Sequence, residues 1–174
     1  MGFIFKRAAR CCFAVTLACL SLPVAPAHAL EVGDEAPDFE AMSLRENMSV
    51  RLSTYRGRVV YLEFWASWCP PCWDALPLLE QVNDELHREG LEVIGVNLNE
   101  NLSEAKKAVK KIGVSFPMLH PEDGWVMRAY EVKAMPMGVL IDRKGMVRYK
   151  TLGLKKTDLH ELKKQIRKLQ WTGR

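Results

Sequence analysis

Two cysteines, Cys69 and Cys72, stand three residues apart in the stretch WASWCPPC (65–72). Thiols at this spacing can serve as a redox pair, as half of a metal site or as a small structural disulfide. A structural disulfide is a weaker interpretation, because a loop this short gains little closure entropy. A closed zinc site needs four ligands. The other candidates downstream are three histidines without ligand spacing: His87, His120 and His160. The redox interpretation is therefore favoured.

The residues that follow Cys69 predict which of the two thiols reacts first. A helical pattern runs from Pro70 to about His87, which puts Cys69 at the N-cap of this helix. Unpaired N–H groups and the helix macrodipole stabilise a thiolate at that position. Cys69 is therefore expected to be an exposed nucleophile with a lowered pKa, and Cys72 to resolve the mixed disulfide. Because Pro71 has no N–H to donate to the sulfur, the pKa should fall only modestly, which favours a reductant over a strong oxidant.

Apolar patterns along the chain predict the elements that hold this helix in place. Buried strands are expected at 58–66 and 91–98, because both are nearly continuous runs of β-branched, aromatic and aliphatic residues. Shorter helices are expected at 103–111, with Ser103 as N-cap, and within 123–132. The remaining elements are an irregular segment 31–57 that holds a short strand and turn at 49–57, an antiparallel pair of strands at 137–142 and 146–153, and a last helix at about 157–169. This order predicts a single mixed α/β sandwich.

The first 29 residues predict an export signal. Basic residues precede an apolar run at 11–22, and the stretch PAHA (26–29) supplies small residues for cleavage after Ala29. The alternative is an uncleaved anchor, with the protein on the membrane and facing the periplasm. Two prolines shorten the apolar helix below the roughly 20 residues that a membrane span needs. A cleaved signal (1–29) and one periplasmic domain (30–174), not inserted in the membrane, are therefore expected.

Cleavage would change both the cysteine content and the charge. It would remove three of the five cysteines: Cys11, Cys12 and Cys19. The exported chain would keep only the pair, in a compartment where thiols are not held reduced by default. Cleavage would also remove three basic residues and no acid, which lowers the formal charge from +4 to +1. Such a charge gives no reason to expect a nucleic-acid partner.

Five segments of the chain, taken in order, resemble the exported TlpA/ResA/DsbE-like branch of the thioredoxin superfamily. They are VGDEAPDF (32–39), LSTYRGRVVYLEFWASWCPPC (52–72), VSFPML (114–119), MPMGVLID (135–142) and GMVRYKTLG (145–153). The resemblance implies a thioredoxin-like three-layer sandwich, in which helices flank a mixed central sheet. It also implies an N-terminal extension, a central insertion at about 99–119, and a thiol:disulfide oxidoreductase that needs no cofactor or metal.

The resemblance assigns roles to four residues. Cys69 matches the attacking cysteine and Cys72 the resolving one. Pro136 matches a cis-proline that faces the disulfide and helps to dock an extended substrate segment. Glu63 matches a buried acid, whose burial would raise its pKa and allow it to exchange a proton with Cys72. The alternative is that Glu63 lies near a strand end and reaches water.

The resemblance also implies a substrate-binding surface beside the cysteines. Five residues are expected to contribute to it: Trp68, Pro70, Pro71, Met135 and Met137. The thioethers of Met135 and Met137 could form an adaptable apolar surface, assist a copper ion or simply pack. Trp65 is expected in the core. Ala75 stands where many relatives carry an acid, which puts in doubt any mechanism with a second carboxylate beside the thiols.

The expected partners also follow from the resemblance. Protein thiols and disulfides are the expected substrates, with apocytochrome c before haem attachment as the client class. A membrane electron donor of the DsbD or CcdA type would re-reduce the pair. Two rival functions stay open, namely a disulfide donor that runs the exchange in reverse and a redox-regulated, copper-handling chaperone. A peroxidase is disfavoured because no threonine stands just ahead of Cys69.

Overall fold

The computed structural model describes residue 2 and residues 29–172 of the 174-residue chain. The predicted signal peptide, including its three cysteines, therefore lies outside the described residues except at positions 2 and 29. In the described part, no helix is long and apolar enough to cross a membrane.

The described residues form one seven-stranded sheet and four α-helices. The strands are β1 (Glu40–Ser43), β2 (Ser49–Arg51), β3 (Val59–Trp65), β4 (Leu91–Asn97), β5 (Met118–His120), β6 (Met137–Ile141) and β7 (Val147–Leu152). The helices are α1 (Pro70–Leu86), α2 (Leu102–Ile112), α3 (Trp125–Ala129) and α4 (Leu159–Thr172). Short 3-10 turns lie at Leu52–Tyr55, His87–Glu89 and Lys156–Asp158.

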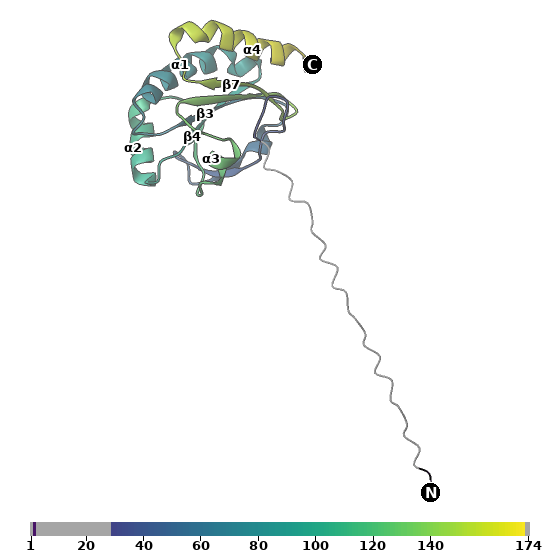
Figure 1. The fold of residues 1–174 in the computed structure, drawn as a ribbon. Coiled ribbons are helices and arrows are strands. Elements are labelled where there is room, and N and C mark those ends of the chain that lie inside the picture. The colour runs from purple at the N-terminus through teal and green to yellow at the C-terminus, as the bar shows by residue number, and fades with distance from the viewer. Residues whose placement is uncertain (1, 3–28, 173–174) are drawn as a thin grey trace.

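The strand that leads to the cysteines lies inside the sheet. The strand order is β2-β1-β5-β4-β3-β6-β7, with β3 parallel to β4 and antiparallel to β6. Every residue of β3 and β4 is buried, as expected for strands covered on both faces. In Figure 1, α1 and α4 lie on one side of the sheet and α3 on the other. The expected three-layer sandwich with a mixed central sheet is therefore confirmed.

Alternation along β3 divides the core into two clusters. Tyr61 and Trp65 pack with α1, α2 and α4, in the cluster that also holds both cysteines. Leu62 and Phe64 belong to the second cluster, which includes residues from α3 and from the N-terminal segment. Because successive side chains of a strand point to opposite faces, Glu63 points to the same face as the cysteines. The sheet thus directs one carboxyl toward the layer that carries the thiols.

Two local predictions are wrong. Asn101, rather than Ser103, is the N-cap of α2, and its side-chain oxygen accepts from the N–H groups of Ser103 (2.9 Å) and Glu104 (3.3 Å). Asparagine caps a helix as well as serine does, and here it precedes the serine. The segment expected to be irregular contains β1, which pairs with β5 so that Met42 lies opposite His120. This pairing joins segments far apart in the chain and leaves no local signal.

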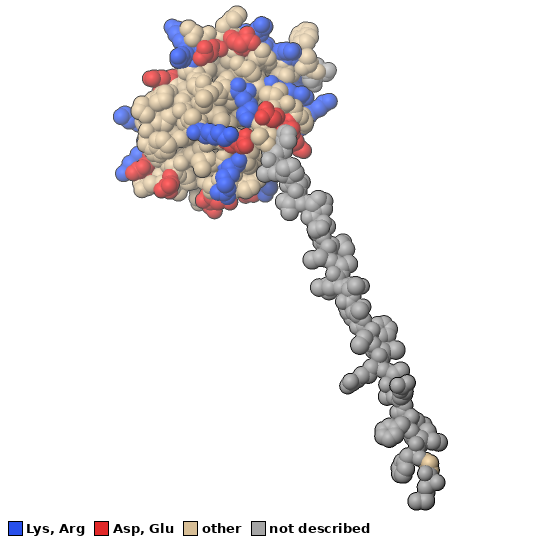
Figure 2. All heavy atoms as spheres, in the orientation of Figure 1, with Lys and Arg blue, Asp and Glu red and all other residues tan. Residues whose placement is uncertain are grey.

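Charged side chains of both signs are distributed over the surface. Figure 2 shows Lys and Arg mixed with Asp and Glu beside a broad uncharged area. Where α4 covers α1, Lys163 and Arg167 both pair with Glu85. The basic C-terminal helix is therefore partly neutralised by the helix that it covers.

Candidate active site at the start of helix α1

Cys69 is the N-cap of α1, as predicted. Its backbone is extended (φ −99°, ψ 97°), and Pro70 and Pro71 occupy the first two helical positions. No amide of the helix donates to its side chain. The N–H of Cys72 donates instead to the Cys69 carbonyl, at 3.0 Å. The first turn therefore offers the sulfur fewer hydrogen-bond donors than an ordinary helix start does.

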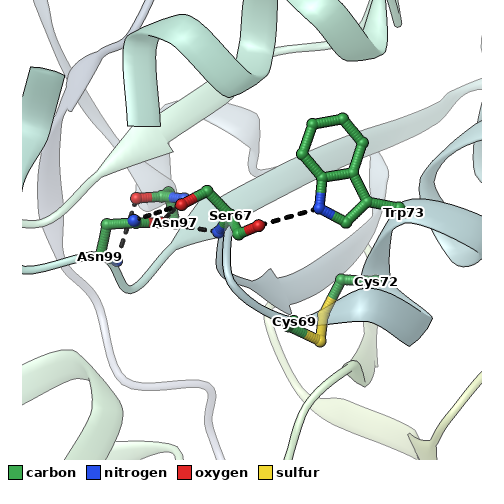
Figure 3. The surroundings of a disulfide bond; sticks show 6 residues. All are labelled: Ser67, Cys69, Cys72, Trp73, Asn97 and Asn99. Carbon is green, nitrogen blue, oxygen red and sulfur yellow. Dashed lines mark hydrogen bonds between the residues drawn. A yellow bond between two sulfur atoms is a disulfide. The ribbon is translucent and has the colours of Figure 1, made fainter. Parts of the chain in front are cut away.

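Cys69 and Cys72 are joined by a disulfide, with their Cα atoms 5.4 Å apart. Figure 3 shows the bond at the start of the helix. Cys69 is only 5% exposed and Cys72 is fully buried, so the expectation of an exposed nucleophile is wrong for this oxidised state. Both cysteines belong to a hydrophobic cluster against which Trp73 and Met135 pack. Cys69 remains the more accessible of the two sulfur-bearing residues.

Exposed apolar residues flank the buried Cys69 along the chain. The Trp68 side chain is 64% exposed, and Pro70 and Pro71 are exposed as well. These residues form a rim on both sides of the cysteine that is expected to attack. Their part in substrate binding stays a prediction.

Glu63 is buried beneath the helices that cover one face of the sheet, and the residue is only 1% exposed. Its neighbours in register are Gly95 on β4 and Gly138 on β6. Neither carboxyl oxygen has a well-formed hydrogen bond to a described residue. Burial raises the pKa of Glu63 to about 8, and the nearby Tyr61 hydroxyl offsets only part of this effect. The expected burial is therefore confirmed and a position open to water is excluded, whereas the proton-transfer role stays a prediction.

Gly138 leaves the space that the Tyr61 hydroxyl occupies. A Cβ atom at position 138 would lie 1.9 Å from that hydroxyl and 2.4 Å from Thr151 Oγ1. The two hydroxyl oxygens are 3.1 Å apart and share a hydrogen bond. Burial raises the pKa of Tyr61 well above its ordinary value, so the hydroxyl stays neutral. Any larger residue at position 138 would displace this polar group from the Glu63 side of β3.

The predicted proline and methionines lie just before and within β6. The Met135–Pro136 peptide bond is cis, as the resemblance implied. Met135 packs against the cluster that contains the cysteines, whereas Met137 is buried in the cluster on the other face of the sheet. The two thioethers therefore do not face one site. Among the described residues, no group of three or more His, Cys, Asp or Glu side chains is placed to hold a metal ion. The docking role of Pro136 stays a prediction.

A polar network that the sequence did not predict supports the residues that precede Cys69. Asn99 accepts the backbone N–H of Ser67 at 2.8 Å and donates to the Ser67 hydroxyl at 2.7 Å (Figure 3). On the other side, the indole N–H of Trp73 donates to the Ser67 carbonyl at 2.9 Å. The available signal was a pair of asparagines, Asn97 and Asn99, at the end of an apolar strand. The carboxyl ends of parallel strands meet at one edge of a sheet, where sites commonly form.

Comparison with known proteins places the chain among thiol-disulfide exchange proteins. The model of the AhpC/TSA family matches residues 32–150. The thiol-disulfide oxidoreductase ResA of Geobacillus thermodenitrificans is 35% identical over 120 residues, which cover 69% of this chain and 68% of the relative. ResA of Bacillus thuringiensis subsp. konkukian is 31% identical over 138 residues, or 79% of each chain.

A solved structure gives the same result for the fold. A Chlorobium tepidum protein, described as a thiol:disulfide interchange protein DsbE, is 36% identical and superimposes with a TM-score of 0.77. The match covers 82% of this chain and 99% of that protein, and it confirms the expected thioredoxin-like sandwich. With its Cys69–Cys72 disulfide at the start of α1, the chain belongs to the AhpC/TSA family of thioredoxin-like proteins and is a thiol-disulfide oxidoreductase.

Proposed function

We propose that this oxidoreductase works in the periplasm and reduces disulfides of client proteins. The predicted signal (1–29) supports the compartment, and its removal would leave Cys69 and Cys72 as the only cysteines. A chain that kept the signal as an anchor would act on the same side of the membrane.

In the proposed cycle, the Cys69 thiolate attacks one sulfur of a client disulfide. A mixed disulfide forms, and the other client sulfur leaves as a thiolate that takes up a proton. Cys72 then loses its proton and attacks the Cys69 sulfur, which releases the second client thiol. Two electrons pass to the client, and the Cys69–Cys72 disulfide of the structure is the oxidised product. A donor dithiol returns two electrons to the pair.

The observation that carries the reducing direction is the start of α1. A strong oxidant of this type owes its potential to a stabilised reduced form, in which the thiolate is favoured. Here Pro70 and Pro71 remove two N–H groups from the first turn, and the N–H of Cys72 is bound to a carbonyl. The Cys69 thiolate would therefore gain little from the helix start, which favours giving electrons over taking them.

Glu63 is the proposed proton acceptor and donor for Cys72. The residue is buried on the face of the sheet that carries the thiols, and its pKa of about 8 lies near neutral pH. A general base or acid works best when its pKa is close to the working pH. A protonated Glu63 also leaves no buried charge on the face of the sheet that carries the oxidised pair.

The proposed client and electron donor rest on the family resemblance in the sequence. Apocytochrome c, whose thiols must be reduced before haem is attached, is the proposed client class. A membrane protein of the DsbD or CcdA type is the proposed donor. A disulfide-donating role would need the opposite direction of electron flow.

The reduction potential of the Cys69–Cys72 pair tests the proposed direction. The purified protein is equilibrated in thiol buffers of known potential, and its redox state is read by alkylation and mass spectrometry. A potential near that of thioredoxin, about −270 mV, is expected for the reductant. A potential near that of the strong oxidant DsbA, about −120 mV, would reverse the direction and leave the exchange chemistry intact.

A further inference from the structure

Ser67, two residues before Cys69, has all its polar groups bound by side chains from other elements (Figure 3). Its N–H and its hydroxyl are bound by Asn99, at 2.8 and 2.7 Å. Its carbonyl accepts from the indole N–H of Trp73, at 2.9 Å. Asn99 follows β4 and Trp73 belongs to α1, so the residue is held from both sides. We call Ser67, Asn99 and Trp73 the Ser67 clamp.

Asn99 is itself held in one orientation. It is 4% exposed, and its side-chain oxygen also accepts from Asn97 Nδ2 at 2.9 Å. Its backbone N–H donates to Asn97 Oδ1 at 3.0 Å, and that oxygen lies 3.3 Å from Nδ1 of the half-buried His120. Buried polar groups bonded in this way form rigid networks. The end of β4 thus supplies a fixed anchor for Ser67.

Trp73 forms the other side of the clamp and is also fixed. Its ring packs against the hydrophobic cluster that contains the cysteines. The Lys111 ammonium, from α2, lies 5.3 Å from the centre of the ring, within the range of a cation–π contact. The indole therefore has little freedom to release the Ser67 carbonyl.

The residue that benefits from this rigidity is Trp68, which lies between Ser67 and Cys69. Its backbone is held on both sides, by the clamp at Ser67 and by the helix and the disulfide at Cys69. Its side chain, however, is 64% exposed and therefore adds little to the core. A large aromatic ring on a rigid support binds a partner at a low cost in ordering entropy.

We propose that the Ser67 clamp determines specificity for polypeptide substrates, with Asn99 as its positioning residue. The clamp fixes the backbone that carries Trp68, so that its exposed indole can contact the polypeptide chain next to the disulfide of a client. A small disulfide has no such chain and reaches the sulfur without this contact. The proposal rests on disulfide exchange at Cys69 and Cys72, and it holds for either direction of electron flow.

The test compares a protein substrate with a small one. Second-order rate constants are measured for the reduction of insulin and of bis(2-hydroxyethyl) disulfide by the reduced protein. Asn99→Ala should lower the insulin rate constant relative to the small disulfide by roughly three- to tenfold, the loss expected from one or two hydrogen bonds. Trp73→Phe, which keeps an aromatic ring but removes the bond to the Ser67 carbonyl, should lower this ratio by a smaller factor.

Asn101→Ala is the matched control, because it is the same substitution two positions further along the chain. Asn101 accepts from two amides at the start of α2, and among the described residues these are not partners of Ser67. The variant should leave the ratio of the two rate constants unchanged. If Asn101→Ala lowers the ratio as much as Asn99→Ala does, the effect is one of general stability and the proposal is overturned.

A double-mutant cycle tests whether Asn99 acts through Trp68. In a Trp68→Ala background, Asn99→Ala should no longer change the ratio, because the indole that it positions is absent. An undiminished effect in that background, or equal slowing of both substrates by Asn99→Ala alone, would overturn the proposal. Should Asn99→Ala not fold, Ser67→Ala removes one bond of the clamp and is tested in the same cycle.

The comparison between a protein substrate and a small one can also be made for oxidation by the protein. The oxidised protein is allowed to oxidise reduced ribonuclease A or dithiothreitol, and the two rate constants are compared. A protein that oxidises both but reduces neither insulin nor the small disulfide would refute the proposed direction. The effect of Asn99→Ala on the ratio of the two oxidation rate constants would then test the role of the clamp independently of the direction of electron flow.

Discussion

Two strand-to-helix units, β3–α1 and β4–α2, lie next to each other in the sheet and differ at the start of the helix. The N-cap of α2 is Asn101, whose side chain accepts two backbone amides. The N-cap of α1 is Cys69, whose side chain accepts none and is followed by two prolines. A good N-cap typically contributes about 1 kcal/mol to stability. One helix start is therefore built for stability, whereas the N-cap side chain of the other takes part in the redox pair and does not cap its helix.

Strands β3 and β4 also differ in how far they favour stability. Glu63 on β3 lies opposite Gly95 on β4, and the carboxyl is buried without a well-formed hydrogen bond to a described residue. Burying an ionisable group in this way is costly, and such exceptions to the usual rules gather at functional sites. The β3–α1 unit thus gives up local stability at two positions, namely Cys69 of the redox pair and Glu63, the proposed proton carrier.

Replacing Cys69 by Ser has the largest expected effect, because it turns the reactive N-cap into an ordinary hydroxyl N-cap. Insulin reduction should fall by roughly a thousandfold or more, since a hydroxyl cannot form a disulfide. Cys72→Ser keeps the attacking thiol but removes the resolving one, so a mixed disulfide with the client should accumulate and be detected by mass spectrometry. Accumulation in the Cys69→Ser variant instead would reverse the two roles.

Glu63→Gln removes the buried acid from β3 and should change how stability depends on pH. The pKa of Glu63 is raised in the folded protein from 4.5 to about 8, so the folded state holds this proton more tightly than the unfolded chain. The contribution of protonated Glu63 to the free energy of unfolding is fully present below pH 4.5. It is lost as the pH rises toward 8, by about 1.4 kcal/mol per pH unit.

Glu63→Gln should lack this contribution to the pH dependence of stability. The free energy of unfolding of the variant, relative to that of the wild type, should therefore increase between pH 5 and 8. Urea unfolding of the oxidised protein at several pH values measures the difference. Two stability curves that stay parallel across this range would contradict the raised pKa.

Pro71→Ala tests why the start of α1 differs from that of α2. The substitution returns one N–H to the first turn, where it can donate to the Cys69 thiolate and stabilise the reduced form. The reduction potential should rise by about 30 mV, which corresponds to one charge-assisted hydrogen bond of about 1.4 kcal/mol. Pro77→Ala, within the same helix but away from its N-cap, is the control and should leave the potential unchanged. An unchanged potential in Pro71→Ala would mean that the prolines do not set it.

Asn101→Ala has the smallest expected effect and concerns the stable unit alone. It should lower the free energy of unfolding by about 1 kcal/mol, because two amides at the start of α2 lose their acceptor. Asn101→Ser should restore most of this loss. The reduction potential should not change in either variant, and a change would show that the two helix starts are coupled.

The sequence was sufficient to predict the reactive helix start and the strand that precedes it. The spacing of Cys69 and Cys72, with prolines between them, predicted the N-cap position, and the apolar run before them predicted β3. The exposure of Cys69 was predicted wrongly. Its burial in the oxidised state involves packing of Trp73 and Met135 against the cysteine cluster, and Met135 comes from a segment more than sixty residues away.

The features that could be predicted from the sequence were therefore local: the spacing of the two cysteines, the helix start with its missing N–H groups, and the apolar pattern of the buried strands. These features depend on residues within a few positions of one another. Three further features became clear only in the folded chain: Glu63 lies in register with Gly95 and Gly138, Met135 and Met137 lie on opposite faces of the sheet, and Asn99 binds Ser67. Each of these depends on strand register and on the meeting of distant segments, which local propensity does not encode.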